Sequence, residues 1–165
     1  MTNVEGLIEV LGQETEGYRK LSTLAERKRQ IIIDQDLTGL ERSTTEEQDL
    51  SDHLKSLENR RIQILKTFTD QDVIPTVSDI VAALPQEDEI TVSLSRAREE
   101  LLEVAGRMQF LNSQNEVLLK QALEMVDFDL TLFKSLRQAP ESGNYGRDAY
   151  STGELLPSGA FDTKQ

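Results

Sequence analysis

The sequence contains one long run of helical periodicity that no proline interrupts, and this run sets the minimum length of the fold. From Asp88 to Leu136, apolar residues recur at offsets of three, four and seven, the spacing of one stripe on an α-helix. The next proline is Pro140. The run predicts a single helix about 70 Å long, at a rise of about 1.5 Å per residue. Its stripe consists of Leu94, Ala97, Leu101, Ala105, Met108, Leu111, Leu118, Ala122, Val126, Phe133 and Leu136.

Two further long helices are predicted upstream. Thr2 and Glu5 form a capping box at the start of the first, and Asp36 caps the second, which runs to about Asp70 with Gly39 in its first turn. The first stripe consists of Val4, Leu7, Ile8, Leu11, Tyr18, Leu21, Ala25 and Ile32. The second consists of Leu37, Leu40, Leu50, Leu54, Leu57, Ile64, Leu65 and Phe68.

A short helix is predicted between the second and third long ones. Pro75 breaks the pattern, and the stretch "TVSDIVAAL" follows, with Thr76 and Asp79 as its cap and Pro85 as its end. Because no segment shows the alternation of a strand and two connections are short, we expect an all-α fold. The predicted architecture is an elongated antiparallel bundle of three long helices and one short helix, with a flexible C-terminal tail.

The predicted domains are a helical domain over 1–137 and a tail over 138–165. The segment "PESGNYGRDAYSTGELLPSGAFDTKQ" is rich in Gly, Ser and Pro and has no apolar period. Such composition predicts a disordered or weakly docked tail.

Charge and composition exclude several classes of function. The formal net charge of −12 disfavours binding to nucleic acid, and the basic run Arg27–Arg29 is most simply a solvated helix face. There are no cysteines, and therefore no disulfides or thiolate zinc sites. The N-terminus lacks the pattern of a signal peptide, and no apolar run approaches the roughly 18 residues of a membrane helix. We therefore expect a soluble cytoplasmic protein without membrane insertion.

No catalytic or cofactor motif is present. The single histidine, His53, cannot supply the paired Glu-x-x-His elements of a metal site in a helical bundle. The glycines do not form a phosphate-binding loop, and the acidic pairs at 46–47 and 99–100 have hydrophilic neighbours. The sequence predicts no enzyme activity, no metal and no cofactor.

The end of the last helix carries more apolar surface than one bundle face needs. Between Val117 and Leu136, the polar residues form one narrow stripe (Lys120, Glu124, Asp127, Thr131, Lys134), whereas a bundle helix needs an apolar stripe of only about 100°. Either this part lies centrally between two other helices, or it binds a partner. Helices of about 45, 50 and 70 Å packed side by side leave about 20 Å of the last one without an internal neighbour, which favours partner binding.

Two asparagines interrupt this helix. Asn112 and Asn115, in "LNSQNEVLLKQAL", lie three residues apart on one face, together with Met108, Leu111, Leu118 and Leu119. A carboxamide at a core position must satisfy two donors and one acceptor.

The chain resembles the FlgN family of flagellar export chaperones over roughly residues 4–137. The resemblance rests on "LENRRIQIL" (57–65), on "TVSDIVAAL", and on the pattern Leu111, Asn112, Asn115, Leu118, Leu119 followed by a long apolar helix end. The tail segment "NYGRDAY" is also similar to the end of some family members.

The resemblance implies a chaperone that holds hook–filament junction proteins in the cytoplasm. It implies binding of their C-terminal amphipathic region, prevention of premature assembly, and delivery to the flagellar export gate. Independently of the resemblance, Tyr145 and Tyr150 are amphipathic anchors in the predicted tail and are candidates for contact with the export machinery. The implied partner-binding residues are Leu118, Leu119, Ala122, Leu123, Met125, Val126, Phe128, Leu130, Leu132 and Phe133.

Three hypotheses remain for Asn112 and Asn115. They fix the helix register in the core, they bond the backbone of the 71–88 connection, or they contact the substrate. The alternative function is a dimeric coiled-coil scaffold that pairs through the same helix end. A stable homodimer distinguishes it from the chaperone, which we expect to be a monomer or weak oligomer.

Overall fold

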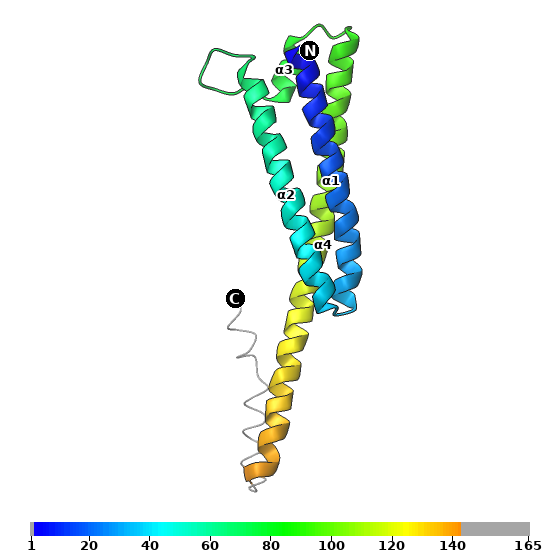
Figure 1. Cartoon of the computed structure of the whole chain (residues 1–165), viewed down its shortest axis with the longest axis vertical. Helices are drawn as coiled ribbons and strands as arrows, with labels where there is room; N and C mark the ends of the chain where they lie inside the picture. The colour runs from blue at the N-terminus through cyan, green and yellow to red at the C-terminus, as the bar shows by residue number, and fades with distance from the viewer. Residues whose placement is uncertain (1, 143–165) are drawn as a thin grey trace. The chain divides into compact units, whose positions relative to one another are not determined.

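The computed structural model describes the backbone of residues 2–142 and the side chains of residues 2–137. It contains four helices, α1 (Asn3–Ile33), α2 (Leu37–Lys66), α3 (Val77–Ala83) and α4 (Glu89–Ser142), and no strand among these residues (Figure 1). The all-helical class and the order of three long helices with one short helix are confirmed. The predicted tail over 138–165 lies outside the described residues from residue 143 onward.

Side-chain caps set the starts of the first three helices, as predicted. The Thr2 hydroxyl accepts from the Glu5 N–H at 3.1 Å, and the Glu5 carboxylate accepts from the Thr2 N–H at 2.8 Å. Asp36 accepts from the Gly39 N–H at 2.9 Å. Thr76 and Asp79 form the same reciprocal box at the start of α3. Each cap satisfies an N–H that the first turn leaves without a helical partner.

Two helix ends differ from the prediction. α2 ends at Lys66 rather than near Asp70. The Thr67 N–H donates to Ile64 O at 3.0 Å and the Phe68 N–H to Leu65 O at 3.1 Å, while the Thr67 hydroxyl donates to Ile64 O at 2.6 Å; these three-residue bonds close the helix. α4 continues through Pro140 to Ser142. Proline lacks the N–H that would bond the carbonyl four residues back, so this last turn has one hydrogen bond fewer.

The chain forms two compact units, Met1–Asn115 and Glu116–Gln165, with the boundary inside α4. In the first unit, α1 and α2 run antiparallel and close together (Figure 1). Gly17 allows the approach: a Cβ at this position would lie 2.6 Å from Leu54 Cδ2. The core of this unit contains Leu7, Val10, Leu11, Leu21, Leu54, Leu57, Leu65, Ile80, Leu94 and Leu101.

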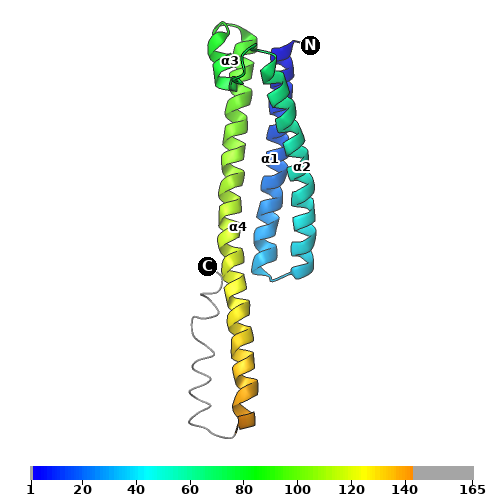
Figure 2. The same ribbon diagram turned by 90° about the vertical axis from the view of Figure 1, so that its left-hand side faces the viewer.

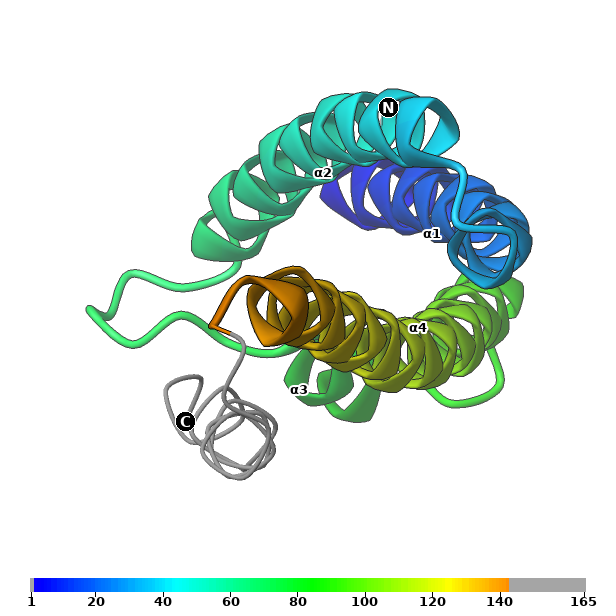
Figure 3. The same ribbon diagram turned by 90° about the horizontal axis from the view of Figure 1, so that it is seen from below.

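The first part of α4 packs on α1. Figures 2 and 3 place α1 between α2 and this part of α4. α2 runs opposite to α1, and α4 runs opposite to α2 and therefore in the same direction as α1, as expected for three long helices that alternate in direction (Figure 2). Arg107 pairs with Glu26 at 2.8 Å across this contact. The connection over 67–88, which contains α3, joins the end of α2 to the start of α4.

Candidate functional site

The described end of α4 exposes most of its large apolar side chains. In the second unit, eight of them are 41–61 % exposed. We call these eight the C-terminal apolar surface of α4: Val117, Leu123, Met125, Val126, Phe128, Leu130, Phe133 and Leu136. Because successive residues of a helix are about 100° apart, they point around most of the helix circumference. In the first unit, by contrast, α4 buries Leu94 and Leu101 completely or almost completely.

The ten predicted partner-binding residues fall into two groups. Six belong to the C-terminal apolar surface: Leu123, Met125, Val126, Phe128, Leu130 and Phe133. The other four are half-buried: Leu118, Leu119, Ala122 and Leu132. The structure therefore leaves six large apolar side chains available to a partner, and the binding role of all ten stays a prediction.

A cation borders this surface. The Arg137 guanidinium lies 5.8 Å from the centroid of the Phe133 ring, a distance at which the ring face attracts a positive charge. The aliphatic stem of such an arginine can cover part of the ring while its charge stays in water.

The two asparagines differ in burial and in bonding. Asn115 is 5 % exposed, and its side-chain Nδ2 donates to the main-chain carbonyl oxygen of Ala25 in α1 at 2.8 Å. Asn112 is exposed, and its Nδ2 lies 3.0 Å from Met108 Sδ within α4. Neither bond reaches the 71–88 connection. Asn115 thus ties the last residue of the first unit to α1.

The sequence matches one protein family over most of its length. A scan against protein families matches residues 1–152 to the family described as FlgN protein. This covers far more than half of the 165 residues. The chain belongs to the FlgN family. Comparisons with curated proteins and with solved structures find no match.

Membership of the FlgN family indicates a flagellar export chaperone, which is not a known class of enzyme. Within residues 2–142, no group of three or more His, Asp or Glu side chains is placed to hold a metal ion, and His53 is exposed on α2. None of the helices in the described part has both the length and the apolar composition needed to cross a membrane.

Sequence reasoning missed a buried ion pair between α1 and α2. Glu14 is 3 % exposed, and its Oε2 lies 3.4 Å from Arg61 Nη1. That oxygen accepts no hydrogen bond, so the contact is an ion pair without hydrogen-bond geometry. Burial is the main cause that raises the pKa of Glu14; Arg61 acts in the opposite direction, and Glu58 raises this pKa further.

A signal for this pair was present in the sequence. Glu14 lies three residues after Leu11 on the apolar stripe of α1, and Arg61 lies four after Leu57 on that of α2. Opposite charges that interrupt two apolar stripes predict a buried pair, because an isolated buried charge is costly. The sequence alone does not show that the turns carrying Glu14 and Arg61 lie side by side.

Proposed function

We propose that this protein is a cytoplasmic flagellar type III export chaperone for hook–filament junction proteins. It binds their C-terminal amphipathic region, prevents premature assembly and delivers them to the export gate. The family match over residues 1–152 supports the role. The exposure of the C-terminal apolar surface of α4 supports the place of binding.

The chemistry of this surface suits an amphipathic helix. Such a helix buries one apolar face against another apolar surface, and each apolar Å² removed from water contributes about 25 cal/mol. Contiguous exposed apolar side chains of this kind often mark interaction sites. Because the eight side chains point around most of α4, a partner can contact it from more than one side.

The experiment measures binding of a C-terminal fragment of a hook–filament junction protein from the same genome by isothermal titration calorimetry. Leu123→Ala and Phe128→Ala should each raise the Kd at least about fivefold, because a truncated interface anchor commonly costs more than about 1 kcal/mol. Leu37→Ala is the matched control, since Leu37 is a 69 % exposed leucine on α2, outside this surface. It should leave the Kd unchanged.

Two results would contradict the proposed binding place. One is an unchanged Kd in both α4 variants, and the other is an equal rise in Leu37→Ala. Absence of any binding between the wild-type protein and fragments of all the junction proteins of that genome would contradict the proposed function itself.

The alternative is a scaffold protein that forms a homodimer through the same surface. It is favoured by the same exposed side chains, because a second copy of α4 could cover them. Light scattering coupled to gel filtration separates the two functions. A chaperone is expected as a monomer or weak oligomer without substrate, and a scaffold as a stable dimer that Phe128→Ala weakens.

The predicted contact of Tyr145 and Tyr150 with the export gate lies outside the described residues. It stays a prediction. Replacing both by Ala should lower delivery to the gate without changing affinity for the junction-protein fragment.

A further inference from the structure

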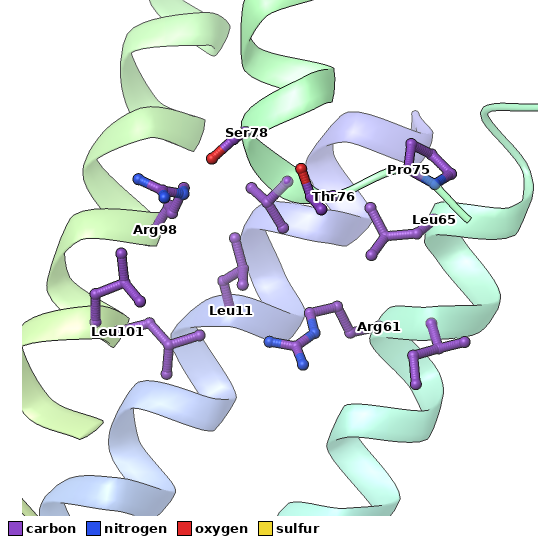
Figure 4. A pocket seen from close by; sticks show the side chains of 11 residues that line it. Leu11, Arg61, Leu65, Pro75, Thr76, Ser78, Arg98 and Leu101 are labelled. Atoms are coloured by element: carbon purple, nitrogen blue, oxygen red, sulfur yellow. The ribbon is translucent and has the colours of Figure 1, made fainter. Parts of the chain in front are cut away.

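A pocket of about 400 Å³ lies within the first compact unit (Figure 4). All four helices contribute to it. Leu11 of α1, Leu65 of α2 and Leu101 of α4 give it an apolar lining, and the segment 75–78 at the start of α3 lines it as well. Its volume is in the range of about 300–1,000 Å³ that is usual for ligand sites.

The charged residues that line this pocket are two arginines. Arg61 comes from α2 and Arg98 from α4, on opposite sides of Leu11 (Figure 4). No acidic residue is part of the lining, although the chain has 30 acidic residues and a net charge of −12. The pocket is therefore a local exception to the charge of the protein.

The two arginines differ in how far they are already neutralised. Arg61 has Glu14 at 3.4 Å and Glu58 at 3.9 Å. Arg98 is half-buried and has no carboxylate within 4 Å among the described residues. A guanidinium carries five donors in a planar fork that matches a carboxylate. Arg98 is thus the group best placed to receive one.

The combination of lining and charge selects the occupant. We propose that this pocket binds a peptide segment of a partner protein in which a carboxylate stands beside apolar side chains. The apolar side chains lie against Leu102, which is 55 % exposed at the pocket, and against the half-buried Ile62 and Val77, over a base formed by the core leucines. Arg98 pairs with the carboxylate. This site is separate in sequence from the C-terminal apolar surface of α4 and does not depend on the proposed function.

The test is an NMR titration of the full-length protein with the capped pentapeptide AELLA and its neutral analogue AQLLA. AELLA should shift the amide signals of pocket residues and bind at least about fivefold more tightly than AQLLA, because a hydrogen bond to a charged group is stronger than a neutral one. Arg98→Gln should remove this difference. Arg98→Glu should reverse it, so that the peptide AKLLA binds more tightly than AELLA.

Matched control variants test whether the effects come from this pocket. Arg96→Gln, on α4 but not in the lining of this pocket, should leave the preference for AELLA unchanged. Leu102→Ala should weaken binding severalfold, whereas Phe110→Ala, at an equally exposed apolar residue outside the pocket, should not. Circular dichroism melts of all variants should match the wild type, because the changed side chains are exposed or half-buried.

Three outcomes would overturn the proposal. The first is equal binding of AELLA and AQLLA, or no binding of either. The second is displacement of AELLA by equimolar decanoate, which would assign the pocket to a fatty acid. The third is a severalfold gain in affinity for AELLA on deletion of residues 143–165, which would assign it to the chain's own "GELL" segment at 153–156.

Discussion

Asn115 donates a hydrogen bond of 2.8 Å from its side-chain amide to the carbonyl oxygen of Ala25, ninety positions away in the sequence. Both residues are buried. The bond joins α1 and α4 at the residue where the first compact unit ends. A buried amide of this kind favours one register of two helices, because any slip leaves its polar atoms without partners.

Replacing Asn115 by Asp tests this bond with almost no change of shape. The carboxylate cannot donate to Ala25 O at neutral pH, and a buried unsatisfied charge costs at least about 1–3 kcal/mol. We expect Asn115→Asp to lower the free energy of unfolding by this amount in urea denaturation at pH 7. Asn112→Asp is the control: its side chain is exposed, and the change should cost less than about 0.5 kcal/mol.

Acidification provides a second check of the Asn115 variant. A protonated carboxyl can donate to the carbonyl oxygen again, and burial raises the pKa of such a carboxyl, so the difference from wild type should shrink as pH falls and be smallest below the ordinary Asp pKa of about 4. Equal losses in the two Asp variants at pH 7 would show that the bond to Ala25 does not hold the register.

Local rules in the sequence were sufficient to predict the helices. Capping at Thr2, Asp36 and Thr76 depends on residues three positions apart, and the helical stripes depend on offsets of three, four and seven. The packing of α4 on α1 was not predictable in this way, because it depends on the path of the 67–88 connection. The contacts that show where α4 lies, such as the one between Arg107 and Glu26, join residues that are distant in the sequence.

The candidate sites were likewise predictable only where they lie within one helix. The apolar excess near the end of α4 was predictable because it lies within one helix. The pocket was not, since Leu11, Arg61 and Arg98 come from three helices. Gly17 was also missed: a glycine inside a helix has no distinctive sequence signal, and its role became clear only from the position of Leu54.

Two glycines of α1 give a prediction about helix packing. A Cβ at Gly17 would lie 2.6 Å from Leu54 Cδ2 and 3.1 Å from Leu54 Cγ, and Leu54 is buried. The resulting overpacking costs about 1–3 kcal/mol and exceeds the helix-propensity gain of up to about 1 kcal/mol. Gly17→Ala should therefore lower Tm. At Gly12 nothing lies within 4 Å of the added Cβ, so Gly12→Ala should raise Tm. A higher Tm in both variants would mean that α1 and α2 do not touch at Gly17.

The buried Glu14 predicts an unusual pH dependence. Its pKa is raised chiefly by burial, so between its ordinary value of 4.5 and the raised value the folded state binds more protons than the unfolded state. Stability falls as pH rises through this interval. The charged groups facing Glu14 are Arg61 and Glu58 of α2. Glu14→Gln should raise Tm at pH 7, and this gain should disappear below pH 4.5.

Two further variants test whether the cost of burying the Glu14 carboxylate exceeds its attraction to Arg61. Arg61→Gln should lower Tm at pH 7, because it removes the positive charge beside the buried carboxylate. Glu16→Gln, at an exposed glutamate of the same helix, should change Tm little at either pH. If Glu14→Gln lowers Tm at pH 7 as much as Arg61→Gln does, the attraction of the pair outweighs the cost of burial.

Truncation of a leucine should destabilise the protein far more in the first part of α4 than in the second. Leu101 is 7 % exposed in the core of the first unit, and Leu101→Ala should lower the free energy of unfolding by about 2–5 kcal/mol through lost burial and the cavity left behind. Leu123 is 51 % exposed, and its truncation should cost less than about 1 kcal/mol. Urea denaturation of the free protein measures both. A loss at Leu123 equal to that at Leu101 would make Leu123 an ordinary core residue, and the partner-binding surface would have to lie elsewhere.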